Sequence, residues 1–329
     1  MEPLAFYCVC DRNHFLGLVG LINSLRIVGH NEPVYVLDCG LTEAQREVIE
    51  ENAVVVTMAP DTSPVMLKHV LPISRPAEVM VLVDVDVIFT RRLSEIVEQA
   101  RQLQKPVLFL NDVTDRFHPA WESLGFGAPV PHPYFNSGML ILPAAPARAF
   151  LKLFEQGQRR LDAGLVAPAY AGTQASVRGQ MPRPEDPFYF PDQDVLNAMI
   201  GTAIQLGSVS VAAEGAVSYW PFPGVRVTDT DRLECRYQDG SQPFILHHIL
   251  TKPWNGVVAP SVYTKLLTRL LCGPDLRIRV TTSLPMALRV GWTSPLARQT
   301  LRIRAWLRGQ LRGRIGLRAW LAARNECGG

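Results

Sequence analysis

Two carboxylates separated by one residue, Asp84 and Asp86, directly follow five consecutive apolar residues at 79–83. Such an apolar run indicates a strand that is buried on both faces. In an extended chain, residues two apart project to the same side, with their backbones about 7 Å apart. Two anions in that position repel each other, and a divalent cation shared with a phosphate would relieve the repulsion. The simpler alternative is that one Asp caps a turn while the other faces water, because D-x-D is a common tripeptide.

Three further segments place polar side chains at the boundaries of predicted elements. They are residues 134–141, 190–197 and 246–254. The first puts an Asn-Ser pair just before an apolar strand, the second puts Asp, Gln and Asp at a helix start, and the third joins two histidines to a lysine. Taken singly, each segment has a simpler interpretation as a turn, an N-cap or surface polar residues beside a packed Trp. The combination of these three segments with the Asp84–Asp86 pair indicates a functional site.

The first third of the chain alternates short β-branched runs with amphipathic segments. This pattern predicts an α/β fold, with a parallel sheet covered by helices. Ligands of such sheets bind beyond the carboxyl ends of the strands, where polar residues stand in this sequence. The predicted strands cover 5–9, 34–37, 54–57, 79–83 and 107–110, and the predicted helices cover 17–28 and 43–51, the second with a capping box that starts at Thr42.

A second block begins at Tyr134. Two stretches rich in Pro and Gly, 117–133 and 164–191, are expected to cover an acceptor. The other elements expected here are a strand at 138–142, a helix at 147–161, a helix, turn and strand over 195–213, and a helix at 261–271.

The composition excludes several classes of protein. The chain has 329 residues, 47% apolar and 19% charged, which is enough to bury a core and excludes disorder and fibrous architectures. A net charge of +3 is too small for a protein whose whole surface binds nucleic acid. Because no C-x-x-C pair occurs, we interpret the cysteines as buried thiols in a reduced cytosol. They are Cys8, Cys10, Cys39, Cys235, Cys272 and Cys327.

The charge is distributed unevenly. Residues 265–329 contain 13 basic and two acidic side chains, which gives +11 and leaves −8 for residues 1–264. Arginines alternate with Trp and Leu over 289–324, although Gly309, Gly313 and Gly316 weaken a helix. We expect a body at 1–264 and, at 265–329, a basic, partly amphipathic helical extension. An interfacial helix on anionic lipid is the preferred interpretation of this extension, with a solvated tail or nucleic-acid contact as the alternatives.

Taken together and in this order, the motifs resemble those of the family-8 retaining glycosyltransferases, the group that includes glycogenin and the bacterial lipopolysaccharide galactosyltransferases. The resemblance covers about residues 4–256 and rests on D-x-D, F-N-S-G, P-D-Q-D-x-L-N and a degenerate H…K-P-W. It implies a GT-A type, Rossmann-like nucleotide-diphospho-sugar transferase domain with a mostly parallel sheet. It further implies that Asp84, Asp86 and a histidine hold Mn²⁺, or Mg²⁺, on the diphosphate of a UDP-sugar. A mixed oxygen and imidazole shell agrees with manganese and disfavours calcium.

The histidine motif departs from the family pattern. The usual form has histidine six residues before the lysine and glycine three before it. Here His247 is five residues before Lys252, His248 is four before it, and Ile249 stands at the glycine position. We take His247 as the metal ligand and His248 as the second choice.

The resemblance also implies roles for individual residues toward the donor. Asp11 and Asn13, in the turn after the first strand, would face the uracil, although His14 stands where an aromatic Tyr is usual. Lys68 falls where family members have a basic side chain that contacts the donor, the alternative being a solvated lysine on a helix face. The full donor-binding set is Asp11, Asn13, Lys68, Asp84, Val85, Asn136, Ser137, Asp192, Gln193 and Lys252, of which Asp192, Gln193 and Lys252 are the catalytic candidates.

The activity implied is metal-dependent transfer of a hexose from a UDP-sugar to a saccharide or glycolipid acceptor, with retention, as in lipopolysaccharide or polysaccharide biosynthesis. Lys252 and the metal would stabilise the departing UDP. The alternatives are a nucleotide-sugar-binding module without turnover and a sugar-nucleotide nucleotidyltransferase. The latter is disfavoured because residues 10–15 lack a Gly- and Arg-rich phosphate loop. We expect a cytoplasmic protein, because the start of the chain has no secretory pattern, and peripheral contact with the inner face of the membrane through the basic extension.

Overall fold

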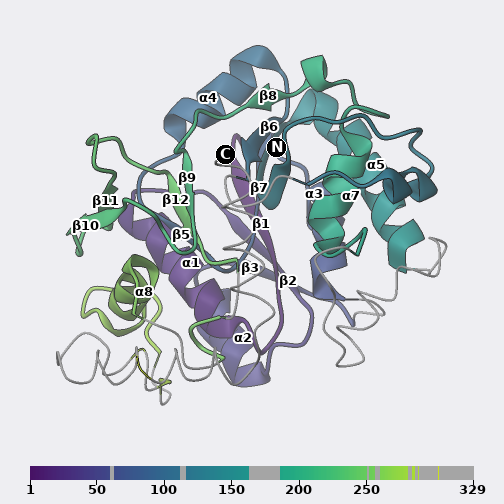
Figure 1. The fold of residues 1–329 in the computed structure, drawn as a ribbon. Coiled ribbons are helices and arrows are strands. Elements are labelled where there is room, and N and C mark those ends of the chain that lie inside the picture. The colour runs from purple at the N-terminus through teal and green to yellow at the C-terminus, as the bar shows by residue number, and fades with distance from the viewer. Residues whose placement is uncertain are drawn as a thin grey trace.

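The computed structural model is shown in Figure 1. It describes residues 1–59, 63–111, 116–162, 186–249, 252–255 and 260–280, together with Leu284, Pro285, Leu288 and Ile303. Most of the predicted loop at 164–191 and nearly all of the basic stretch at 289–324 therefore lie outside the described residues.

A seven-stranded sheet forms the centre of the molecule, with strand order β3-β2-β1-β4-β7-β6-β8. Its strands are β1 (Ala5–Cys10), β2 (Val34–Asp38), β3 (Val54–Thr57), β4 (Val79–Val83), β6 (Val107–Leu110), β7 (Phe135–Pro143) and β8 (Ser210–Val211). Neighbouring strands run parallel except at β7, which is antiparallel to both β4 and β6. The mostly parallel sheet expected from the sequence is confirmed, and β7 carries the reversal.

The inner strands β4 and β7 are buried along their whole length, as continuous apolar runs indicate, whereas the edge strands β3 and β8 are partly exposed. Successive residues of β4 alternate between two cores: Val81 belongs to one and Leu82 to the other. Helices α1 (Phe15–Ile27), α4 (Ser94–Leu103) and α8 (Val262–Cys272) contribute to the first core, and α3 (Val70–Ser74), α5 (Ala144–Asp162) and α7 (Pro191–Met199) to the second. In Figure 1, α3, α5 and α7 lie on one side of the sheet and α1 on the other.

A second, three-stranded sheet has the order β5-β12-β9. Its strands are β5 (Val87–Phe89), β9 (Val217–Tyr219) and β12 (Ile245–His247), and β12 is antiparallel to β5 and parallel to β9. Because β5 begins just after Asp86, this sheet carries a late segment of the chain to the end of β4. A hairpin of β10 (Arg226–Asp229) and β11 (Glu234–Arg236) lies outside both sheets.

Most predicted elements are confirmed. The five strands of the first third lie where expected, and α2 (Glu43–Glu50) begins with a capping box between Thr42 and Gln45. The expected helix, turn and strand at 195–213 correspond to α7, the 3₁₀ helix η4 (Leu206–Ser208) and β8. The 117–133 segment contains a further 3₁₀ helix, η2 (Pro119–Leu124). Ser261 caps α8, as predicted to within one residue.

Two local predictions were wrong. The strand expected at 138–142 is β7, which begins at Phe135 because Phe135 and Asn136 pair with β6. Asn136 and Ser137 therefore lie inside the strand rather than before it. Cys272 is exposed, whereas the other described cysteines are buried and all five are free; Cys327 lies outside the described residues. Within the described residues, no helix is long and apolar enough to cross a membrane.

Candidate active site

Asp84 and Asp86 lie in a turn rather than in an extended chain, which corrects the geometry expected for them. The turn closes through the Val87 amide, which donates to the Asp84 carbonyl at 3.3 Å. The Asp84 amide donates to the Gly138 carbonyl at 2.8 Å, and the His248 amide donates to the Asp86 carbonyl at 3.1 Å. The Asp84 backbone is thereby fixed to β7 and the Asp86 backbone to the end of β12. The two acids meet because both flanks of the turn are hydrogen-bonded to neighbouring strands.

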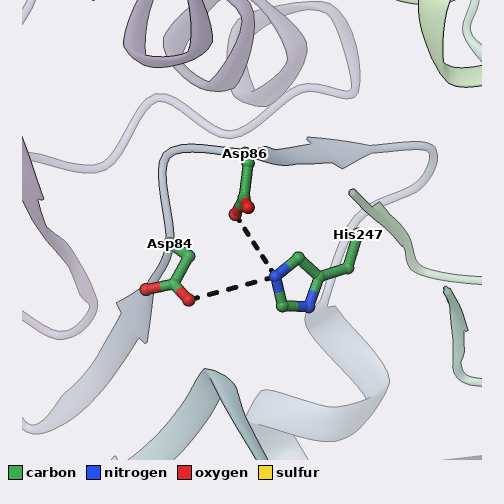
Figure 2. A group of neighbouring side chains, drawn as sticks. All are labelled: Asp84, Asp86 and His247. Carbon is green, nitrogen blue, oxygen red and sulfur yellow. Dashed lines mark ion pairs between the residues drawn. The ribbon is translucent and has the colours of Figure 1, made fainter. Parts of the chain in front are cut away.

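His247, the last residue of β12, brings its imidazole between the two carboxylates (Figure 2). Its Nε2 lies 3.2 Å from Asp86 Oδ1 and 3.9 Å from Asp84 Oδ2. One ligand atom from each of the three residues lies within 4.8 Å of the other two. His247 and Asp86 are buried, while the Asp84 side chain is 30% exposed and forms the open side of the group. Two carboxylates and one imidazole suit a divalent cation that accepts oxygen and nitrogen ligands.

Two lysines contact the carboxylates on their outer sides. Lys68 Nζ lies 2.6 Å from Asp84 Oδ1 and 2.6 Å from Asp192 Oδ2, and it donates to the Ser137 carbonyl at 3.1 Å. Lys252 Nζ forms an ion pair with Asp86 Oδ2. Lys68 is only 8% exposed, which excludes the solvated position considered for it. Each Asp thus gives one oxygen to a lysine and turns the other toward His247.

The pKa values of the two acids, Asp84 and Asp86, are shifted in opposite directions. Burial raises the pKa of Asp84 above its ordinary value, against the opposing charge of Lys68. Burial acts on Asp86 in the same sense, but the cationic Lys252 and the adjacent His247 outweigh it and hold the pKa of Asp86 well below its usual range. Burial disfavours the Lys68 ammonium, yet the two carboxylates beside it raise its pKa.

The first turn of α7, which carries the P-D-Q-D motif, packs against the start of β7, which carries the F-N-S-G motif. Asn136 Nδ2 donates to Gln193 Oε1 at 2.8 Å, and Ser137 Oγ donates to Asp192 Oδ2 at 2.7 Å. The Asn197 side chain makes two hydrogen bonds to the Phe135 backbone. Its Oδ1 accepts from the Phe135 amide and its Nδ2 donates to the Phe135 carbonyl, both at 2.8 Å. Because Asp192 also contacts Lys68, this polar group is continuous with the two acids.

Asp194, the second Asp of the D-Q-D motif, is buried and links the start of α7 to Arg116 and Tyr134. Its Oδ1 accepts from Arg116 Nε at 2.9 Å and from the Tyr134 hydroxyl at 2.7 Å, and its Oδ2 accepts from the Phe190 amide at 2.8 Å. Burial raises the pKa of Asp194 to about 6, opposed by Arg116 and by the Tyr134 hydrogen bond. The sequence did not single out Arg116. The only signal for Tyr134 was its place just before F-N-S-G.

His248 lies outside the group of ligand atoms. Its ring packs against Trp220, Phe222 and Tyr263, with a centroid distance of 5.0 Å to Tyr263. Burial lowers the pKa of His248 to about 4. Of the two histidines considered as ligands, the structure therefore places His247 beside the carboxylates and His248 in an aromatic pocket.

The turn after β1 is held by Asp11, whose Oδ1 accepts from the Asn13 amide at 3.0 Å and lies 2.7 Å from His14 Nδ1. The His14 ring meets Trp254 edge to face, with centroids 6.3 Å apart. The turn is therefore next to the 252–254 segment rather than within the group of two acids and His247.

Val85 lies against α1. A Cβ at Gly17 would lie 2.6 Å from the Val85 carbonyl oxygen and 2.5 Å from Trp254 Cη2. Glycine is needed here because α1 passes directly over both the acidic turn and Trp254.

Comparison with known proteins places the fold. No protein-family model and no curated protein matches the sequence. Among solved structures, the galactosyltransferase LgtC in complex with donor and acceptor sugar analogs matches with a TM-score of 0.54 and 16% identity, over 82% of this chain and 98% of LgtC. An active-site mutant of LgtC matches with a TM-score of 0.53 and 15% identity, over 85% of this chain and 97% of that one. The bifunctional glycosyltransferase WbbM matches with a TM-score of 0.53 and 14% identity, over 83% of this chain and 50% of WbbM. The chain shares the GT-A fold of these glycosyltransferases, as the motifs implied.

Proposed function

We propose that this chain is a metal-dependent glycosyltransferase that transfers a hexose from a UDP-sugar to a saccharide or glycolipid acceptor, with retention at the anomeric carbon. The observation that carries the proposal is the group of Asp84, Asp86 and His247 at the end of β4, joined through Lys68 to Asp192. In a GT-A fold this edge of the sheet faces the ligand. The complex of LgtC with donor and acceptor sugar analogs supports the same class of substrates.

The residues present fit a divalent cation. Asp86 Oδ1 is buried and accepts no hydrogen bond, and it faces His247 Nε2 at 3.2 Å. Asp84, Asp86 and His247 would hold Mn²⁺ or Mg²⁺, and the bound ion would supply Lewis-acid stabilisation of the diphosphate leaving group.

The chain's own residues would do the remaining work. Lys252, at 19% side-chain exposure, is placed to donate to phosphate oxygens and so to stabilise the charge left on UDP. The carboxylate of Asp192 is fixed by Lys68 and Ser137, and Gln193 is fixed by Asn136. These fixed groups would orient the sugar and stabilise positive charge at its anomeric carbon. For retention, Asp192 would act either as nucleophile or as an electrostatic partner during attack on the face that UDP leaves.

Hydrolysis of donor sugars in the absence of acceptor tests this function. Full-length protein with Mn²⁺ is expected to release UDP from one of UDP-glucose, UDP-galactose or their N-acetyl forms, and a chelator is expected to stop the release. Pyrophosphate exchange instead of UDP release would indicate a nucleotidyltransferase. UDP binding with neither reaction would indicate a binding module, for which the altered histidine spacing is the supporting feature.

We further propose that the basic extension predicted at 265–329, whose first residues lie in α8, brings the enzyme to the cytoplasmic face of an anionic membrane through its stretch at 289–324. The charge of +11 and the alternation of Arg with Trp and Leu over 289–324 support it. The full chain is expected to float with vesicles that contain acidic phospholipid and not with neutral ones. Replacing Arg302, Arg304, Arg308, Arg312 and Arg314 by Gln is expected to abolish flotation. Equal flotation of the two proteins would exclude the membrane role.

A further inference from the structure

The site is already close to electrical balance before any ligand binds. Its three carboxylates are Asp84, Asp86 and Asp192, and its two ammonium groups are Lys68 and Lys252. With these groups ionised and the imidazole neutral, one negative charge remains. A divalent cation alone would leave one positive charge in a mostly buried site. A cation together with a diphosphate that carries two negative charges would return the site to its starting charge.

The two lysines differ in freedom. Lys68 is 8% exposed and is enclosed by Asp84, Asp192 and the Ser137 carbonyl. Lys252 is 19% exposed and contacts Asp86 Oδ2 and the His248 carbonyl, the latter at 2.7 Å. Lys252 has fewer hydrogen-bonding partners than Lys68 and is more exposed to solvent. Its ammonium group can therefore leave the Asp86 carboxylate and bind a phosphate at a lower cost in free energy.

We propose that Lys252 is the resident counter-ion of Asp86 in the nucleotide-free site, so that a divalent cation and a nucleoside diphosphate bind as a coupled pair. This inference rests on the proposed function. When a cation approaches the oxygens that face His247, the ammonium on the opposite oxygen of Asp86 repels it. When a diphosphate is present, the ammonium has an anion to move to, and the carboxylate is released to the cation. The coupling is reciprocal, because each ligand must raise the affinity for the other by the same factor.

A contrasting role for Lys252 gives the opposite expectation. If the ammonium served only to hold Asp86 in place as a ligand, removing it would loosen the carboxylate and weaken cation binding. The direction of the change in Mn²⁺ affinity therefore separates the two roles, and no turnover is needed to measure it.

The test is Mn²⁺ binding, followed by electron paramagnetic resonance of the free ion, with and without UDP. In the wild type, UDP is expected to tighten Mn²⁺ binding by about tenfold or more. In Lys252→Gln, binding without UDP is expected to tighten by about fivefold, and the enhancement by UDP to fall below about threefold. Lys252→Arg keeps the charge and is expected to restore the wild-type pattern.

Lys105→Gln is the matched control, because it removes the same charge beside the amino end of β6, where Lys105 Nζ donates to the Gly207 carbonyl. It is expected to behave as wild type in both measurements. Weaker or unchanged Mn²⁺ binding by Lys252→Gln without UDP would overturn the counter-ion role while leaving the proposed function intact. A wild type that binds neither Mn²⁺ nor UDP would instead overturn the proposed function itself.

Discussion

Replacement of Asp84 by Asn is expected to abolish sugar transfer and metal-dependent UDP binding together. The change removes an anionic ligand atom from the group and leaves the buried Lys68 with Asp192 as its one carboxylate partner among the contacts described. A neutral amide oxygen is a weaker ligand for a divalent cation, and charge on the departing UDP would then lack its main stabilisation. We expect a loss of about 10³-fold or more in transfer rate. Calorimetry with Mn²⁺ and UDP measures the binding.

Asp239→Asn is the control for this substitution, because Asp239 is exposed and contacts Ser241 in the turn between β11 and β12. It is expected to retain both binding and transfer. Circular dichroism and thermal melting establish that the Asp84 variant is folded. If the folded variant binds UDP and manganese normally, Asp84 is not a metal ligand.

Replacement of Gly138 by Ala is expected to displace the imidazole of His247, the proposed metal ligand. A Cβ at Gly138 would lie 2.1 Å from His247 Cε1 and 2.8 Å from Asn136 Oδ1. The strand cannot retreat, because β7 pairs with β4 and its Gly138 carbonyl accepts from the Asp84 amide. The imidazole must therefore move away from the two acids. We expect Mn²⁺ affinity to fall about 10- to 100-fold, with transfer falling at least as far.

Gly207→Ala is the matched control, since a Cβ there would have no heavy atom within 4 Å. Its Mn²⁺ affinity and transfer rate are expected to equal those of the wild type. Measuring Mn²⁺ affinity of the Gly138 variant apart from its stability separates displacement of His247 from general unfolding. Unchanged Mn²⁺ affinity in a folded Gly138→Ala protein would show that His247 is not a ligand.

The central sheet could be predicted because its inner strands, such as β4, are buried on both faces. Runs such as 79–83 carry no polar residue, and only a strand or a buried helix segment accommodates them. The capping box at Thr42 fixed the start of α2 in the same local way. Local composition was sufficient for these elements.

The arrangement of the site could be predicted only in part. The four motifs indicated which residues belong together, but β5, β9 and β12 have three residues each, too few for a periodic pattern. Their pairing, which brings His247 to Asp86, depends on contacts between distant parts of the chain. The turn at Asp84, the burial of Lys68 and the Arg116–Asp194 ion pair also arise from packing, which no local pattern records.

The small sheet has a consequence for when and how the protein becomes able to bind. It joins the end of β4 to a segment that follows far later, since Lys252 and Asp86 are 166 residues apart in sequence. A ligand held between these two residues would connect the ends of a very long loop, and it would bind only the folded chain. Ligand binding would therefore stabilise the folded state and raise the resistance of the whole domain to proteolysis. During synthesis, no nascent chain shorter than 252 residues would contain both partners of this contact, so binding competence would arise only after residue 252 had emerged from the ribosome.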